Sequence, residues 1–272
     1  MVYYRQEHRL NRKEAAMLRK LSTINGYSIQ AQDGELGHVQ DCYFDDEKWT
    51  IRYIVVKTGF WLFGREVLIS PHSVERIDFD AKCLCVAHTQ EQVKGSPDID
   101  THRPISRRKE SEFHIYYNFP AYWGGVGLWG QDMYPRGTET ITDAQNDETQ
   151  KRKADDEDVH LRSIAEISGY RVRAVDNYAG SVTDFIFDET DWALRYVVLK
   201  GSGELQSGRY LISPKWIDQM IWSQATVNVN VSLPSLQSAP TYDASVPVTR
   251  ELEEALFQHF TTHPYWEEVQ ES

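Results

Sequence analysis

The feature that most constrains the fold is an internal repeat with a constant offset of 143 positions. Residues 24–27 read Ile-Asn-Gly-Tyr, and residues 167–170 read Ile-Ser-Gly-Tyr. At the same offset, Leu68–Pro71 recurs as Leu211–Pro214. Chance does not hold one register over about a hundred positions, so the chain is a tandem duplication. Further matched pairs are Asp33/Asp176, Gly37/Gly180, Asp45/Asp188, Arg52/Arg195, Tyr53/Tyr196, Arg107/Arg250 and Tyr122/Tyr265.

Each copy has the pattern of short β-strands separated by turn signals. Residues 37–44 and 49–57 are rich in β-branched and aromatic residues, which favour strands, and residues 45–48 connect them. In a regular hairpin, Asp41 lies opposite Arg52, and in the second copy Asp184 lies opposite Arg195. We interpret these pairs as setting the register rather than as catalytic.

Strands this short cannot protect a core in an open flat sheet, whereas closure covers both the core and the edges. The sequence therefore predicts a mainly β fold with two small closed β-barrels, each followed by a short C-terminal helix. The first helix is predicted over 106–117, with Ser106 as N-cap. The second is predicted over 249–260, with Thr249 as N-cap.

The repeat and the composition together predict four parts of the chain. Residues 1–17 form an N-terminal arm. Residues 18–130 hold the first repeat with its helix and an aromatic tail, and residues 161–272 hold the second repeat with its helix. Residues 131–160 between them are polar and charged, with few large apolar side chains, which is typical of a linker.

Charge and hydropathy exclude several classes of protein. The net charge is −12, and residues 131–272 supply all of it, so broad contact with DNA phosphates is not expected. The longest apolar stretches are strand-sized, which predicts no membrane span. Residues 1–9 have no apolar run of the secretory type, and we expect a cytoplasmic protein. Three cysteines do not make a disulfide framework.

Five segments of the first copy form one recognisable pattern: Gly26-Tyr27, Asp33–Gly37, Val39–Asp45, Trp49–Val56 and Val67–Pro71. With these residues in view, the chain resembles the PRC-barrel family, and it looks most like its tandem two-barrel bacterial members. The resemblance implies a six-stranded barrel in each repeat. It also implies docking onto other macromolecules, because the family includes the cytoplasmic domain of the photosynthetic reaction-centre H subunit and the C-terminal domain of a ribosome maturation factor.

Motifs that carry chemistry are missing from the sequence. It has no Gly-rich phosphate loop, no His-Glu-x-x-His and no Gly-x-Ser-x-Gly. The run Gly124–Gly127 lacks the lysine and the strand–loop–helix setting of a phosphate site. We therefore predict no catalytic residue, no bound metal and no cofactor.

One loop differs between the two copies and is rich in aromatic residues. Residues 58–64 include Phe60, Trp61 and Phe63, where the second copy has Gly201–Ser207. A difference confined to one loop is where function can diverge, and an exposed aromatic patch usually marks a contact. The other interpretation is that these side chains cover an open barrel end or pack on the other copy.

The second aromatic segment runs from Phe113 to Tyr134. Trp129 and Tyr134 are its candidates for a partner contact, because aromatic residues dominate binding hot spots. The same segment could instead join the first barrel to the second. The pair Tyr122-Trp123 returns as Tyr265-Trp266, which favours a structural role for that pair.

The leading hypothesis is a non-enzymatic binding or assembly module that contacts a protein partner or a second copy of itself in a homo-oligomer. A second hypothesis, which rests on the resemblance, is a ribosome- or RNA-associated maturation factor. A third is an enzyme with a site between the barrels, which would need a deep polar pocket with shifted titratable groups.

Overall fold

The computed structural model describes residues 18–59, 62, 64–97, 105–135 and 160–267. Backbone contacts divide the chain into two compact units. Of the described residues, unit N holds those between 20 and 169 together with 191–194. Unit C holds residues 18–19, 170–190 and 195–267. Each unit contains the main sheet of one repeat.

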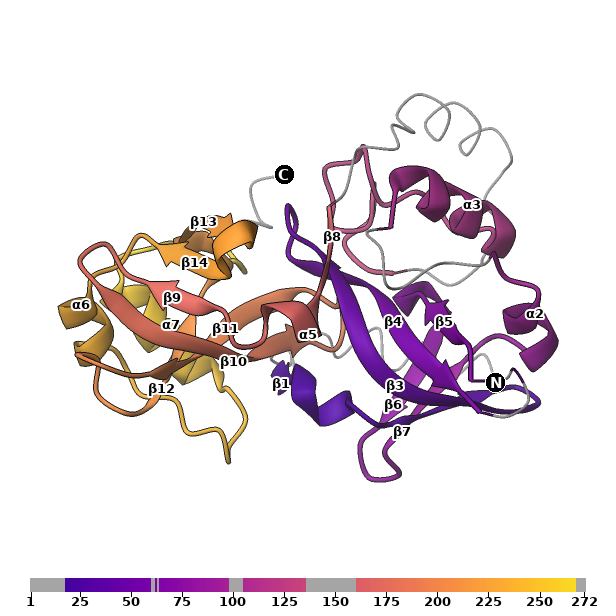
Figure 1. The fold of residues 1–272 in the computed structure, drawn as a ribbon, viewed down its shortest axis with the longest axis horizontal. Coiled ribbons are helices and arrows are strands. Elements are labelled where there is room, and N and C mark those ends of the chain that lie inside the picture. Colours follow the sequence, from indigo (N-terminus) through magenta and orange to yellow (C-terminus); the bar gives the residue numbers. More distant parts are fainter. Residues whose placement is uncertain (1–17, 60–61, 63, 98–104, 136–159, 268–272) are drawn as a thin grey trace. The chain divides into compact units, whose positions relative to one another are not determined.

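The sheet of unit N follows the order β5-β4-β3-β2-β7-β6, with β8 added on β3 (Figure 1). Its neighbours are antiparallel except β2 and β7, which run parallel. The strands are β2 (Ser28–Ala31), β3 (Gly34–Asp45), β4 (Thr50–Thr58), β5 (Glu66–Ile69), β6 (Val74–Asp78), β7 (Cys83–Val86) and β8 (Leu161–Ser163).

The sheet of unit C repeats this path as β12-β11-β10-β9-β14-β13, with β1 added on β10. The equivalent order confirms the tandem repeat that the sequence predicts. The strands are β1 (Leu18–Lys20), β9 (Arg171–Arg173), β10 (Tyr178–Asp188), β11 (Leu194–Gly201), β12 (Arg209–Ile212), β13 (Ile217–Ile221) and β14 (Thr226–Val229).

A glycine sets the spacing of the long hairpin in both units. A Cβ atom at Gly37 would lie 2.0 Å from the carbonyl oxygen of Lys57 on the facing strand. In unit C, a Cβ atom at Gly180 would likewise lie 2.0 Å from the carbonyl oxygen of Lys200. The backbones approach so closely that a side chain cannot fit, which explains why both copies carry glycine there.

Closure of the two sheets into barrels is not confirmed. In unit N the end strands β5 and β6 are joined by the 3-10 turn η3 (Pro71–Ser73), and Ser70 caps this turn by accepting a hydrogen bond from the His72 backbone. Within the described part of unit N, no ladder pairs β5 with β6. Pro71 has no N–H to donate, so the sheet turns a corner there instead of continuing its ladder.

The two predicted C-terminal helices are confirmed. Helix α3 (Arg107–Tyr117) begins after Ser106, whose side chain accepts a hydrogen bond from the Lys109 backbone. Helix α7 (Arg250–His259) begins after Thr249 in the same way. In the described ranges, no helix is long and apolar enough to cross a bilayer. The short helices are η1 (Leu21–Ile24), α2 (Gln90–Lys94), α5 (Ile164–Ile167), η4 (Pro214–Trp216), η5 (Trp222–Gln224) and α6 (Leu233–Ser238).

Helix α3 covers one face of the sheet in unit N. Its Phe113 and Tyr117 join a buried cluster with sheet residues, and the two rings lie 4.7 Å apart between centroids. Phe113 also meets Tyr53 of β4 edge to face at 5.3 Å. Burying several aromatic side chains contributes a large share of the stability of a unit this small. The cluster comprises Tyr43, Tyr53, Val55, Leu68, Ile105, Phe113, Tyr117, Phe119 and Leu161.

The predicted pairing of Asp41 with Arg52 is wrong. The hairpin turn pairs Asp45 with Thr50 rather than Phe44 with Trp49, and a bulge between Tyr43 and Phe44 shifts the register by one more residue, so Asp41 lies opposite Val55. The Arg52 guanidinium instead pairs with Asp45, with Nη2 2.9 Å from Oδ2. In unit C, Arg195 pairs with Asp188 at 3.2 Å, which is the equivalent contact. A bulge adds one residue to one strand and displaces every pair beyond it.

The unit boundaries depart from the repeat boundaries in two places. Residues 18 and 19 open the first repeat but belong to unit C, whereas residues 161–169 open the second repeat but belong to unit N. Of the predicted linker, residues 131–135 continue the fold of unit N, and residues 136–159 lie outside the described residues.

Candidate functional site

A buried carboxylate ties helix α3 to the segment that follows it. Glu110 is only 2% exposed. It accepts hydrogen bonds from the Tyr122 hydroxyl at 2.6 Å and from Arg107 Nη1 at 3.0 and 3.1 Å. Burial raises the pKa of Glu110 to about 7, and the Arg107 guanidinium acts against that rise. The carboxylate is therefore enclosed by donors of its own unit.

A second buried cation lies beside this carboxylate. Arg52 pairs with Asp45 and also donates from Nη1 to the carbonyl oxygen of Leu128 at 2.7 Å. Its guanidinium carbon lies 3.9 Å from the centre of the Tyr122 ring and 4.8 Å from that of Trp129. Burial alone would raise the pKa of Asp45, but the Arg52 charge and hydrogen bond hold it below its ordinary value. Arg52 thus links the hairpin of β3 and β4 to the aromatic tail.

Unit C contains the same network at the matching positions. Glu253 accepts from the Tyr265 hydroxyl at 2.9 Å and pairs with Arg250 at 3.0 Å. Arg195 lies over the Tyr265 ring at 4.0 Å, as Arg52 lies over Tyr122. Since both repeats build it, we interpret the network as a structural requirement of the repeat.

One partner of the network differs between the copies. In unit N the Tyr53 hydroxyl meets Nε2 of His114 at 3.0 Å, whereas in unit C the Tyr196 hydroxyl donates to Glu253 at 3.0 Å. His114 is enclosed among aromatic rings, and burial lowers its pKa to about 3. It is therefore a neutral histidine at physiological pH.

The segment that follows the network is particular to the first repeat. We call residues 124–130 the glycine loop; its sequence is Gly-Gly-Val-Gly-Leu-Trp-Gly. Lys48 Nζ donates to the carbonyl oxygens of Gly125 at 2.8 Å and Gly127 at 2.5 Å. With Arg52 on the carbonyl of Leu128, two cations from the hairpin fix three carbonyl groups of the loop. Such charge-assisted hydrogen bonds are about twice as strong as neutral ones.

The tight path of this loop depends on its glycines. A Cβ atom at Gly125 would lie 2.1 Å from the Gly130 carbonyl oxygen, and one at Gly127 would lie 2.4 Å from that of Asp132. Gly130 adopts a φ of +81°, in the left-handed region. The loop backbone therefore folds on itself in a way that no other residue type allows at these positions.

The glycine loop and the residues after it present apolar side chains to solvent. Val126, at the tip, is 98% exposed. Met133 is 38% exposed and Tyr134 is 42% exposed. A valine that is almost fully exposed gains nothing for folding, so its place on a fixed loop is a candidate contact point. We call Val126, Met133 and Tyr134 the tail patch, named for the segment that carries them.

The five residues predicted from the sequence as partner contacts have different positions. Tyr134 is exposed and belongs to the tail patch. Trp129 is buried at 1% exposure, and its indole Nε1 donates to the Asp191 carbonyl at 2.8 Å. Its ring therefore serves as an internal anchor of unit N. Phe60, Trp61 and Phe63 lie outside the described residues.

Sequence reasoning missed Val126 and Met133. The signal for Val126 was available, because an apolar residue flanked by glycines has little chance to be buried by its own neighbours. Met133 carried no such signal, since a single methionine in a polar stretch is compatible with either burial or exposure.

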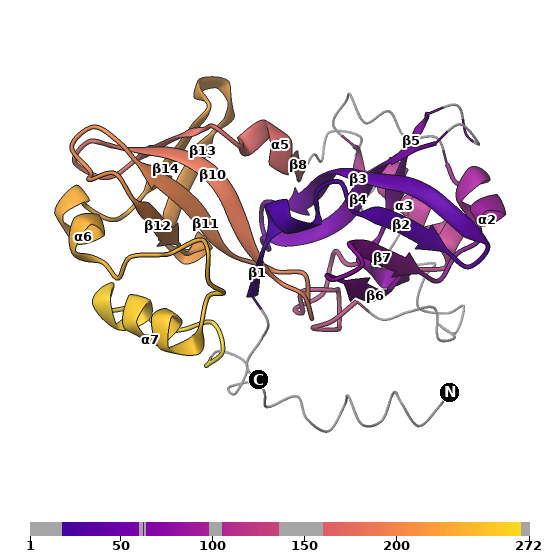
Figure 2. The same ribbon diagram turned by 90° about the horizontal axis from the view of Figure 1, so that it is seen from below.

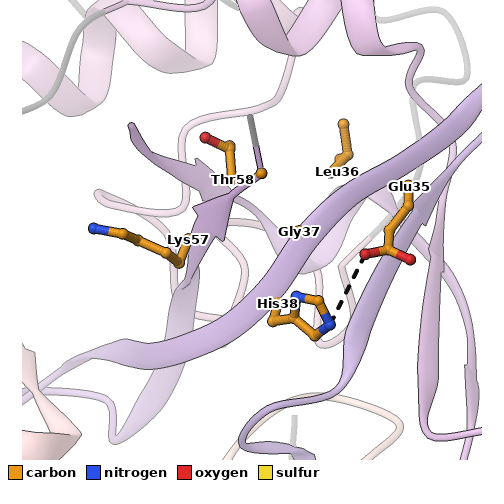
Figure 3. Close-up of a pocket in the computed structure, with 7 residues that line it drawn as sticks. Glu35, Leu36, Gly37, His38, Lys57 and Thr58 are labelled. Atoms are coloured by element: carbon orange, nitrogen blue, oxygen red, sulfur yellow. Dashed lines mark ion pairs between the residues drawn. The ribbon is translucent and has the colours of Figure 1, made fainter. Parts of the chain in front are cut away.

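A shallow hollow of about 250 Å³ lies on the hairpin of unit N (Figure 3). Glu35 and His38 form a long, solvent-exposed ion pair of 3.8 Å at its rim. Figure 3 shows Lys57 pointing away from both of them, so these polar groups do not converge on one point. The lining residues are Glu35, Leu36, Gly37, His38, Lys57, Thr58 and Gly59.

Comparison with known families gives one result. The profile of the PRC-barrel domain matches residues 18–91 and 160–222, which is one segment in each repeat and about half of the chain together. Comparison with curated protein sequences finds no match.

Proposed function

Because the chain belongs to the PRC-barrel family, we propose that it is a non-enzymatic binding module that docks onto a protein partner through the tail patch of unit N. The partner would present an apolar depression that receives Val126, with Tyr134 at its margin.

The observation that carries this proposal is the combination of exposure and fixation at the tip of the glycine loop. Val126 is 98% exposed, and the Lys48 ammonium holds the carbonyl groups of the glycines on either side of it. A loop that is already ordered loses little conformational entropy on binding, so more of the contact energy appears as affinity.

The contact energy of such a patch is sufficient for a specific but modest interaction. Full burial of a valine side chain contributes about 1.5–3 kcal/mol. A half-exposed tyrosine adds an aromatic face and a hydroxyl that can both contact a partner. Together they account for a few kcal/mol, which suits a docking contact that other contacts of the partner would complete.

The internal partners of the titratable groups support the non-enzymatic part of the proposal. Glu110 has the shifted pKa that an acid catalyst would need, but Tyr122 and Arg107 already occupy it and it is almost fully buried. Glu253 has the equivalent position in unit C, where Tyr265 and Arg250 occupy it. A structural network accounts for both carboxylates.

The aromatic loop predicted from the sequence remains a second prediction for the same function. Phe60, Trp61 and Phe63 follow Gly59, which lines the shallow hollow of the hairpin. A Trp61→Ala variant tests that loop separately from the tail patch.

Site-specific photo-crosslinking tests the proposal. A photoreactive amino acid replaces Tyr134 in the full chain expressed in its native cell, and Val246 of unit C, which is 52% exposed, serves as the control position. We expect one dominant adduct from position 134, weakened at least about tenfold by Val126→Asp. An adduct of two 31.6 kDa chains would identify the partner as a second copy. Equal adducts from both positions, insensitive to Val126→Asp, would refute the proposal.

A further inference from the structure

The opening strand of the second repeat completes the sheet of unit N. Strand β8 pairs antiparallel with the end of β3, with Ser163 opposite Tyr43, Arg162 opposite Phe44 and Leu161 opposite Asp45. Figure 2 shows β8 beside the end of β3 that leads into the hairpin turn. The pairing covers an edge that would otherwise expose unpaired backbone groups.

Side chains on both strands reinforce this pairing. Ser163 Oγ donates to Asp41 Oδ2 at 2.6 Å, and the Ala165 backbone donates to Asp41 Oδ1 at 3.0 Å. Arg162 Nε donates to Asp46 Oδ2 at 2.8 Å. Leu161 is 6% exposed and belongs to the buried cluster under α3. The backbone pairing of β8, the contact between Arg162 and Asp46, and the buried Leu161 side chain thus all bind β8 to the same edge of β3.

Unit C is completed in the same way by the opening strand of the first repeat. Strand β1 pairs with β10, and Leu18 is buried at 3% exposure with a bridge to Val248. Arg19 pairs with Glu189 at 3.5 Å. Leu18 and Arg19 match Leu161 and Arg162 at the offset of 143, and Glu189 matches Asp46. The two units therefore use equivalent contacts, each with a strand from the other repeat.

A second piece of the second repeat also belongs to unit N. The Ile51 backbone donates to the Trp192 carbonyl at 2.9 Å, and the Leu194 backbone donates to the Trp49 carbonyl at 2.7 Å. Thr50 and Ala193, which occupy equivalent positions in the two repeats, form a bridge between these hydrogen bonds. These contacts hold residues 191–194 of the second repeat within unit N.

We infer that the edge at the end of the long hairpin strand, Tyr43–Asp45 in unit N, is a strand-docking site whose ligand is the opening strand of another repeat of this type. The mode is β-strand addition, in which main-chain hydrogen bonds give affinity and flanking side chains give specificity. Here the chain supplies both ligands itself. The two halves of the chain therefore stay bound to each other when the covalent connection between them is cut.

Cleavage of the intact, folded chain tests the inference. A specific protease site is inserted between Asp143 and Ala144, and the chain is cut after folding. We expect one complex holding both fragments in equal amounts by sedimentation at micromolar concentration. Fragments that separate at that concentration would overturn the inference.

Charge variants show whether the docked strand holds the fragments together. Arg162→Glu is expected to raise the dissociation constant of the cut protein about tenfold or more, and adding Asp46→Arg should restore most of the affinity. Arg108→Glu is the matched control, because Arg108 is an exposed arginine of α3 whose ion pair with Glu112 stays within that helix. If Arg162→Glu behaves as Arg108→Glu does, the edge of β3 is not the docking site. A double variant no tighter than Arg162→Glu would count against the pairing with Asp46.

Discussion

Replacing Glu110 with alanine should destabilise unit N far more than an ordinary substitution does. Glu110 is 2% exposed, and its removal leaves the Arg107 guanidinium and the Tyr122 hydroxyl buried without their acceptor. The Arg107 side chain is only 6% exposed, so water cannot replace the lost carboxylate. Breaking a buried ion pair by removing one partner costs about 3–5 kcal/mol.

The equivalent substitution in unit C should cost less. Glu253 is as buried as Glu110, but the side chain of its partner Arg250 is 25% exposed, so water can solvate the guanidinium when the carboxylate is gone. The expected loss for Glu253→Ala is about 1–3 kcal/mol. Glu112→Ala removes only exposed ion pairs on α3 and should change stability by less than about 0.5 kcal/mol.

Hydrogen exchange separates the two units in one sample. Amides of β4 report the opening of unit N, and amides of β11 report the opening of unit C. A loss of 3 kcal/mol or more corresponds to at least about a hundredfold loss of protection in β4 of Glu110→Ala, with β11 much less affected. If Glu110→Ala leaves β4 as well protected as Glu112→Ala does, the buried network does not stabilise unit N.

Three further predictions follow from unit N. Burial lowers the pKa of His114 from 6.5 to about 3. Below pH 6.5 the unfolded chain therefore binds a proton at this histidine that the folded protein does not bind, and the free energy of unfolding decreases as the pH is lowered. Wild type should therefore lose up to about 1.4 kcal/mol per pH unit relative to His114→Phe between pH 6 and 4 in urea titrations; parallel profiles would contradict this. Lys48→Met should speed amide exchange at Gly127 and Trp129, whose amides donate backbone hydrogen bonds, by severalfold or more, because the loop carbonyls lose their donor; unchanged exchange would show that the lysine does not fix the loop. Gly125→Ala should cost about 1–3 kcal/mol because its Cβ would lie 2.1 Å from a carbonyl oxygen, whereas Gly26→Ala, with open space around it, should cost only the strain of its φ of +76°, about 1 kcal/mol; equal melting temperatures of the two variants would contradict the close contact.

Much of the architecture was predictable because its signals are local. The repeat offset places every strand of one copy on a strand of the other, and hydrophobic patterns mark strands without reference to distant residues. Ser106 and Thr249 mark the starts of their helices because an N-cap hydrogen bond joins residues only three apart.

Features that depend on distant or irregular geometry were not predictable. The position of the hairpin turn and a bulge in β3 together place Asp41 opposite Val55 rather than Arg52, and neither leaves a clear mark in a β-rich pattern. The exchange of opening strands was also hidden, since Leu18 and Leu161 are equivalent in sequence and only the path of the chain decides which sheet each joins.

The aromatic tail shows the same limit at the level of single residues. Trp129 and Tyr134 are both large aromatic residues of one segment, yet Trp129 is buried and Tyr134 is exposed. What separates them is a carbonyl acceptor at Asp191 and the Arg52 guanidinium over the indole ring. Neither partner is near in sequence, so the pattern of the segment alone could not assign the two roles.

The most direct test of the docking proposal is the dissociation constant of the crosslinked partner, once isolated, for the wild-type chain and two charge variants. Val126→Asp places a carboxylate at the tip of the glycine loop, and Val246→Asp places one on an exposed site of unit C. We predict that Val126→Asp weakens binding at least about tenfold, which is about 1.4 kcal/mol, while Val246→Asp leaves it unchanged. Equal affinities for all three chains would contradict docking through the tail patch.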